Sequence, residues 1–291
     1  MRIDNSPQAL VDEQAQAALY LSHPYGRPVI GWPDEVRRIG RIEAQDFYDH
    51  HYAPNNAILI VAGDVTPDEV RFDAQASYAK VPARPLVPRS EYAQPPRLAE
   101  TRMMVLRSDA SVPYFSRIYR VVSYADAATG EAEALDVFAE LLGGNTSSAL
   151  YRTLVVEKRL ATDAGASYDG MARDAGEFSV YAVPRPGVSL DVLERAVDQV
   201  IAPFAHSEPS APDLARAKIQ LVASAVYRRD NQYSLASAYG EALAVGLTAD
   251  DVEEWPSRIR AVTGASVLKQ VQSALDKRES VSAYLVPHGA K

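Results

Sequence analysis

The stretch WPDEVRRIGRIEAQDFYDHHYAPNNAILIVAGD, residues 32–64, has a counterpart in WPSRIRAVTGASVLKQVQSALDKRESVSAYLVP, residues 255–287. The two stretches align without gaps at an offset of 223 residues (255 − 32), and the chain's two tryptophans, Trp32 and Trp255, head them. Each stretch predicts a Trp-Pro pair, a polar turn, a helix and then a strand. Chance similarity between two short helix-strand units is the alternative. The repeat favours a duplicated protein.

The first copy of this duplication is expected to be incomplete. If the second copy begins near Leu98, the first would begin on the order of 120 residues before Met1. In the first region, helical spacing covers residues 7–21, 42–51 and 67–78, and only residues 57–62 (AILIVA) predict a strand. One strand cannot form a sheet, so this region is expected to borrow strands from a segment outside the chain.

A proline-rich stretch separates the two regions. Residues 82–96 contain five prolines, a density that breaks helices and ladders and favours an extended spacer. We predict the C-terminal part of a first peptidase-like domain at residues 1–81, a Pro-rich linker at 82–97 and a second domain at 98–291.

Downstream of the linker, strands and helices alternate. Alternating hydrophobicity predicts strands at residues 101–107, 114–123, 176–185 and 280–286. Helical spacing predicts helices at residues 131–142, 148–158, 190–205, 213–227, 234–245 and 265–275. These elements predict an α+β fold, a tandem repeat of similar two-layer α/β domains with an incomplete first copy.

The composition argues against several functional classes. A net charge of -8 argues against nucleic acid as a partner, because binding to phosphate backbones needs clustered Lys and Arg. No apolar run approaches the roughly 20 residues of a membrane-spanning helix, so no membrane partner is expected. The chain has no Cys and therefore no disulfide and no thiolate ligand. We expect a soluble protein, cytoplasmic or periplasmic if bacterial, and the compartment is left open.

Several blocks of the chain carry a family resemblance. HPYGRPVIGW (23–32) and YAPNNAILIVAGDV (52–65) resemble the insulinase and pitrilysin family of zinc metallopeptidases, which includes mitochondrial processing peptidase. In the second region LLGGNTSSALYRTL (141–154), PDLARAKIQL (212–221) and IRAVTGASV (259–267) follow in the family's order. The resemblance covers nearly the whole chain and implies a tandem of two similar domains.

The resemblance also implies a zinc site, which the family builds from an H-x-x-E-H helix and a later Glu. The five histidines here are His23, His50, His51, His206 and His288, and none has Glu three residues on or His four residues on. We therefore assign no catalytic residue and no metal ligand in this chain, and expect zinc in the full-length parent. His50 and His51 point about 100° apart on a helix and cannot share an ion. His23 is interpreted as a hydrogen-bonded loop residue.

One loop supplies the candidate substrate-binding residues, namely Gly143, Gly144, Asn145 and Ser147. Its structural interpretation is a helix C-cap followed by an N-cap. The family resemblance implies the alternative of peptide contact, since related members are thought to admit an extended substrate past a glycine-rich loop here. Many active members also carry an Arg and a Tyr just after this loop, where this chain has Val155 and Thr162. This departure weakens the case for peptide anchoring.

Three functional hypotheses follow. The first is the C-terminal portion of a zinc metalloendopeptidase, inactive alone, which shapes a peptide chamber together with an N-terminal catalytic segment. The second is a non-catalytic partner of a paralogous subunit in a heterodimeric peptidase. The third is an unrelated soluble binding domain. The strand-poor first region also predicts an exposed apolar patch, an unpaired sheet edge and self-association.

Overall fold

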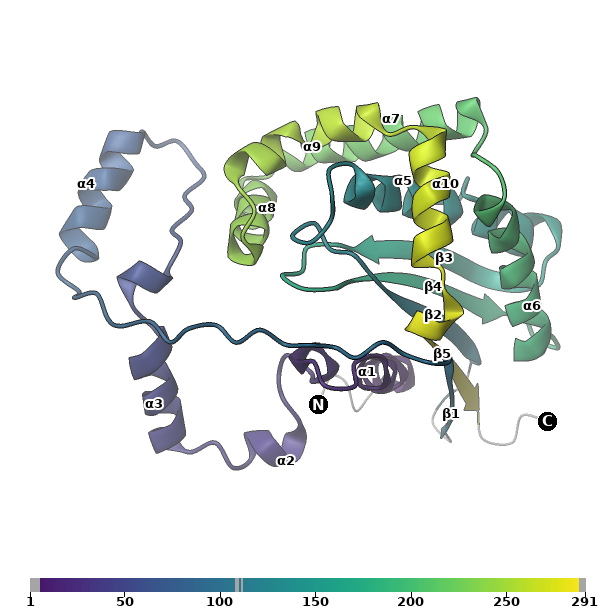
Figure 1. Cartoon of the computed structure of the whole chain (residues 1–291), viewed down its shortest axis with the longest axis horizontal. Coiled ribbons are helices and arrows are strands. Elements are labelled where there is room, and N and C mark those ends of the chain that lie inside the picture. The colour runs from purple at the N-terminus through teal and green to yellow at the C-terminus, as the bar shows by residue number, and fades with distance from the viewer. Residues whose placement is uncertain (1–5, 108–109, 111, 288–291) are drawn as a thin grey trace.

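The computed structural model describes residues 6–107, 110 and 112–287, and its second region contains a five-stranded mixed sheet (Figure 1). The strand order is β1-β5-β2-β4-β3, with bounds Thr101–Arg107 (β1), Tyr114–Val121 (β2), Ala161–Asp169 (β3), Gly176–Pro184 (β4) and Ser280–Pro287 (β5). β1 and β5 are parallel, and the other neighbours are antiparallel. Four of these strands are predicted by the sequence. β3 is not, because its Ala, Gly and Asp residues have low strand propensity.

Helices cover one face of this sheet (Figure 1). Their bounds are Glu131–Gly143 (α5), Leu190–Ile201 (α6), Ala211–Arg228 (α7), Gln232–Val245 (α8), Ala249–Ala261 (α9) and Gly264–Ala274 (α10). Phe138 of α5 stacks on Phe178 of β4 with ring centroids 4.9 Å apart, inside a core that includes Val197 and Val271. The α+β prediction is confirmed.

Three helical segments differ from the prediction. Residues 148–158 form a π-helix at Tyr151–Glu157, and the helix expected at 190–205 ends at Ile201 and continues as a 3₁₀ turn. The polar turn expected after Trp255 and Pro256 is wrong, because both residues lie inside α9. A capping box between Thr248 and Asp251 starts this helix, and Pro256 lies in its interior, where it leaves one backbone hydrogen bond of the helix unformed.

A helix from the first region covers the other face of the sheet. This helix, α1 (Pro7–Leu19), buries Val11, Ala15 and Leu19 against side chains of β2 and β5. The guanidinium of Arg97 donates to the carbonyl oxygens of Ala18 and Leu19 at its C-terminal end, at 2.5 and 2.9 Å. β2 is therefore buried along almost its whole length, since helices pack on both of its faces.

Beyond α1 the chain forms an arm, residues 33–78, that stands apart from the sheet (Figure 1). It contains α2 (Pro33–Val36), α3 (Arg41–His51) and α4 (Pro67–Ser77), and none of the three helices has a buried residue. The strand expected at residues 57–62 is wrong, because this segment lies outside every strand of the described chain. A strand requires a ladder partner, and the arm offers none to this segment.

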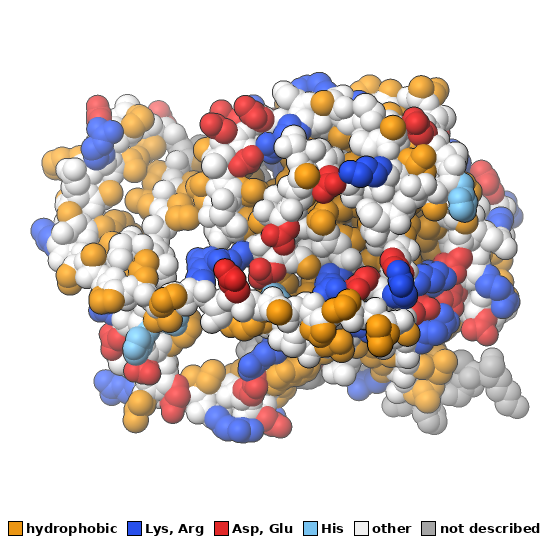
Figure 2. Space-filling model, in the orientation of Figure 1, with side chains coloured by type: hydrophobic (Ala, Val, Ile, Leu, Met, Phe, Trp, Pro, Cys, Tyr) orange, Lys and Arg blue, Asp and Glu red, His pale blue; other side chains and the backbone are white. Residues whose placement is uncertain are grey.

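The arm exposes a large apolar surface. Figure 2 shows hydrophobic side chains on the surface of the arm. The exposed large hydrophobic residues of the arm are Val36, Ile39, Ile42, Phe47, Tyr48, Tyr52, Ile58, Leu59, Val61, Val65, Phe72 and Tyr78. The predicted exposed apolar patch is confirmed.

The segment that returns from the arm to β1 has no helix or strand. Residues 82–97 run as an extended strap, which fits the composition of the predicted linker, although the boundaries of the two domains stay a prediction. No helix in the described part of the chain has the length and hydropathy needed to cross a membrane.

Candidate functional site

The glycine-rich loop follows α5 at a close approach to β3. A Cβ on Gly143 would lie 1.9 Å from the backbone nitrogen of Ala166, which excludes any larger residue. The side-chain amide of Asn145 donates to Glu140 Oε1 at 2.6 Å, and its oxygen accepts from the backbone N–H of Ser147 at 2.7 Å. These side-chain contacts hold the turn that follows α5, whose C-cap is Gly144. The helix after the loop has no side-chain cap hydrogen bond, so only the C-cap of the structural interpretation is observed.

The surface beside this loop has a small cavity with a mixed polar and apolar lining. Ser147 lines a cavity of about 150 Å³ together with Arg152, Asp213 and Arg216. Gly144 is exposed, so the loop remains open to contact from outside. Peptide contact by Gly143, Gly144, Asn145 and Ser147 stays a prediction.

The two positions after the loop lack an anchoring group. Val155 is buried, and the hydroxyl of Thr162 donates to the carbonyl oxygen of Val183 at 3.4 Å. Neither side chain supplies the guanidinium or phenol found at these positions in many active relatives.

The histidines are dispersed over the fold. In the described residues, no group of three His, Cys, Asp or Glu side chains is placed to hold a metal ion. His50 Nδ1 donates to the carbonyl oxygen of Asp46 at 2.6 Å, whereas the ring of His51 packs on Phe47 with centroids 4.4 Å apart. His206 ends the 3₁₀ turn Ala202–Ala205, and His288 lies outside the described residues. The four histidines in the described part of the chain therefore do not come together at one site.

His23 joins three distant segments. Its Nδ1 accepts from the backbone N–H of Tyr25 at 3.2 Å, so Nε2 carries the proton and donates to Asp174 Oδ2 at 3.1 Å. The hydroxyl of Tyr25 accepts from the backbone N–H groups of Arg173 and Asp174, and the backbone N–H of His23 donates to Gln94 Oε1. The hydrogen-bonded loop residue predicted at His23 is thus observed, and it ties the β3–β4 hairpin tip to the strap.

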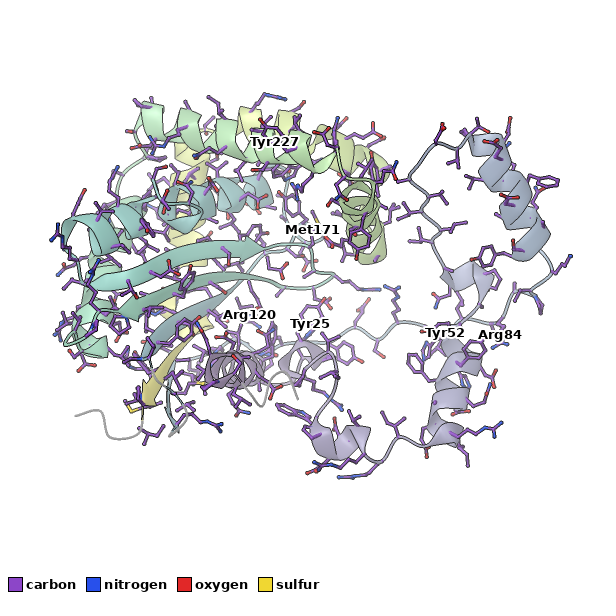
Figure 3. The ribbon with its side chains drawn as sticks, turned by 180° about the vertical axis from the view of Figure 1, so that it is seen from behind. Tyr25, Tyr52, Arg84, Arg120, Met171 and Tyr227 are labelled. Atoms are coloured by element: carbon purple, nitrogen blue, oxygen red, sulfur yellow. The ribbon has the colours of Figure 1, made fainter. Side chains whose placement is uncertain are left out.

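A cavity of about 510 Å³ lies under α7, α8 and α9. The β3–β4 hairpin closes one side of it through Gly170 and Met171. Figure 3 shows Met171 and Tyr25 near this end of the sheet, with Tyr52 and Arg84 farther away toward the arm.

A polar network forms one wall of this cavity. Asp136 Oδ2 accepts hydrogen bonds from the hydroxyl of Tyr124 and from Trp255 Nε1, the latter at 3.2 Å, and the indole also donates to the Tyr124 hydroxyl at 2.6 Å. Burial raises the pKa of Asp136 to about 6, although the two donated hydrogen bonds oppose the shift. Arg258 links α9 to α5 by pairing with Glu133 and Asp251 at 2.7 and 2.9 Å.

The sequence interpretation does not find this cavity. Trp255 is singled out as the head of the second repeat copy, but the pattern places it before a turn and not on a helix that faces a cavity. Tyr124 and Asp136 are 12 residues apart and meet Trp255 only through the packing of α5 and α9. The only hint in the sequence is that the two tryptophans occupy equivalent repeat positions. This hint does not show that Trp255 contacts Tyr124 and Asp136.

Comparisons with known proteins relate most of this chain to one family. The model of the peptidase M16 inactive domain matches residues 38–221. Zinc protease PqqE of Helicobacter pylori is 26% identical over 246 residues, which cover 83% of this chain and 54% of that protein. An uncharacterized zinc protease of Mycobacterium tuberculosis is 28% identical over 297 aligned positions, which cover 100% of this chain and 65% of that protein. The chain thus spans a little more than half of the length of the first relative and about two thirds of the length of the second.

A solved structure shows the same fold. The crystal structure of a protease from Helicobacter pylori superposes with a TM-score of 0.89 at 20% identity, covering 98% of this chain and 68% of that one. Because the family match extends over more than half of the residues, the chain belongs to the peptidase M16 inactive-domain family.

Proposed function

We propose that this chain is the C-terminal, non-catalytic portion of a zinc metalloendopeptidase of the insulinase type. In this function it contributes wall and packing to a peptide chamber, and it supplies no zinc ligand. No catalytic step is assigned to it, since no metal-ligating cluster is found in the residues that the structure describes.

The arm is the single observation that carries the proposal. The second region has a complete sheet with helices on both faces, whereas the arm has three helices and an unpaired extended segment. An amphipathic pattern left exposed in this way favours an interface with another segment. The partner we propose is the N-terminal catalytic segment, whose strands would pair with residues 57–62.

The test compares the chain alone with a longer protein that includes residues encoded in frame upstream of Met1. We expect the longer protein to contain H-x-x-E-H, to bind about one zinc ion and to cleave peptides. The chain alone is expected to bind no stoichiometric zinc and to leave peptides intact. Zinc-dependent cleavage by the chain alone would overturn the proposal.

The same experiment separates the proposal from a heterodimer. A longer protein with a degenerate motif and no activity would replace the proposal with a non-catalytic subunit paired with an active paralogue. Val155 and Thr162, which replace the usual anchoring pair, are the observation that favours this second function. Self-association of the chain alone, measured by sedimentation, is expected in both cases because the arm is exposed.

A further inference from the structure

The cavity of about 510 Å³ under α7, α8 and α9 has no part in the function described so far. Its volume falls within the roughly 300–1,000 Å³ of pockets that hold small organic groups. Its apolar lining comes from three helices and the hairpin tip, through Met171, Leu221, Ala225, Leu235, Ala238, Ala242, Leu247, Val252 and Pro256. A pocket that is mostly apolar, with a few polar groups on one wall, is typical of a binding site.

We propose that this cavity binds the aromatic side chain of a peptide. Its polar wall is aromatic and held rigidly, because the carboxylate of Asp136 fixes both Trp255 and Tyr124 by hydrogen bonds. Tyr168 lies beside Tyr124, with ring centroids 6.3 Å apart. An aromatic guest gains edge-to-face and offset contacts with such rings, which an aliphatic guest of equal area does not.

The charges around the cavity are nearly balanced. Arg228 and Arg229 line it, as do Asp169 and Glu241, while Asp251 is paired with Arg258. The guanidinium of Arg228 lies 5.9 Å from the centre of the Trp255 ring. An uncharged guest therefore suits the cavity better than an ion, which agrees with a side chain of an extended peptide.

Two walls of the cavity are held by the first region. Met171 belongs to the hairpin whose tip is bound by Tyr25 and His23. On α8, a Cβ added to Gly240 would lie 3.4 Å from the Cδ1 atom of Ile60, so the arm reaches this helix. The first region therefore contacts two of the elements that line the cavity, the β3–β4 hairpin and α8. That the natural guest is a peptide rests on the proposed function, whereas the aromatic preference rests on the cavity alone.

The experiment uses the full chain with Trp32→Phe, which leaves Trp255 as the one fluorescent indole. N-acetyl-phenylalaninamide is titrated in, and a saturable change in indole fluorescence is expected with half-saturation in roughly the millimolar range for so small a ligand. N-acetyl-leucinamide should bind at least threefold more weakly. N-acetyl-glutaminamide should produce no saturable change. Equal responses to the three probes would overturn the proposal.

A matched pair of variants locates the binding. Ala238 lines the cavity, and Ala244 lies on the same helix, is exposed and does not line it. Ala238→Phe should fill the cavity and weaken binding at least tenfold, whereas Ala244→Phe should bind like the parent. If Ala238→Phe does not fold, Ala238→Leu should weaken binding by a smaller factor. Undiminished binding in a folded Ala238 variant would place the probe elsewhere and refute the site.

The outcome is independent of the peptidase assay. Cleavage by the longer protein tests the proposed function, and the fluorescence titration needs no catalysis. If probes bind as expected while the longer protein is inactive, the cavity stands and the proposed function fails. If the longer protein cleaves peptides but the probes do not bind, the proposed function stands and the aromatic-binding cavity is refuted.

Discussion

The two copies of the repeat, residues 32–64 and 255–287, have similar patterns and different surroundings. In the second copy, α10 buries Val267 and Val271, and β5 pairs with β1 on one side and β2 on the other. In the first copy, α3 buries nothing, and the segment matching β5 has no ladder partner in the described chain. The same helix-strand pattern therefore builds a core only where neighbouring strands are available.

A pair of equivalent residues shows the size of this difference. Ile58 and Val281 occupy the same repeat position (281 − 58 = 223), yet they are 56% and 0% exposed. Full burial of such a side chain contributes roughly 1.5–3 kcal/mol to the free energy of unfolding. The second copy gains this contribution, and the first can gain it only from a partner.

Placing a charge at the two equivalent positions should give the largest contrast. Val281→Asp puts an unpaired carboxylate into the sheet's core and should unfold the second region at neutral pH. Ile58→Asp should leave the free energy of unfolding, measured in urea, within about 0.5 kcal/mol of the parent, since the side chain of Ile58 meets water. It should also reduce self-association. Near-UV circular dichroism and sedimentation distinguish the two variants, and equal destabilisation would show that residues 57–62 are buried in solution.

Removing an arginine from each region should give the next largest contrast. Arg117 is fully buried and pairs with Glu194 and Asp198 at 2.6 and 2.5 Å, so Arg117→Ala leaves uncompensated charge and should cost about 3–5 kcal/mol. The control is Arg71→Ala in α4, which removes an exposed pair with Asp68 and should cost less than about 1 kcal/mol. Urea unfolding of both variants measures the difference. Similar small losses would mean that solvent reaches Arg117.

The comparison also explains what the sequence predicts well. Alternation predicts four strands, and in β4 the alternate residues Phe178, Val180 and Ala182 are buried in the core that α5 covers. It fails for residues 57–62, since the same apolar run needs a partner that the pattern cannot supply. It also fails for β3, where Ala166 lies against Gly143 of α5 and a Cβ on Gly165 would lie 2.7 Å from the ring of Tyr181, so close packing requires small residues.

The functional sites also divide into features that are local in the sequence and contacts between distant residues. The absence of H-x-x-E-H and the C-cap of α5 at Gly144 are local features and can be found from sequence. The contacts of His23 with Asp174, and of Asp136 with Trp255, join residues 151 and 119 positions apart, and no local pattern encodes them. Long-range contacts of this kind are set by the fold, so they become visible only with the tertiary structure.

Titration of Asp136 should reveal the buried wall of the second region. Its pKa is about 6 in the folded chain and about 3.8 when exposed, so folding binds the proton more tightly. The free energy of unfolding that this group contributes is fully present below about pH 4 and is lost as the pH rises through about 6. At about 1.36 kcal/mol for each pKa unit, the loss is up to about 3 kcal/mol. Asp136→Asn should flatten this part of the curve of unfolding free energy against pH. An unchanged curve would show that the carboxylate is hydrated.

The smallest effect is expected where the two regions meet. Tyr25→Phe keeps the ring that packs edge-on against His23 at 4.4 Å, and removes only the hydroxyl that accepts from the backbone N–H groups of Arg173 and Asp174. The loss should be about 1 kcal/mol of local stability, because each amide can bond to water once the hairpin tip opens. Hydrogen exchange at residues 173 and 174 should accelerate several-fold, while exchange in β2 and β4 stays unchanged. Faster exchange throughout the sheet would instead show that the first region stabilises the whole second domain. Unchanged exchange would mean that the hydrogen bond between His23 and Asp174 is enough to hold the hairpin tip.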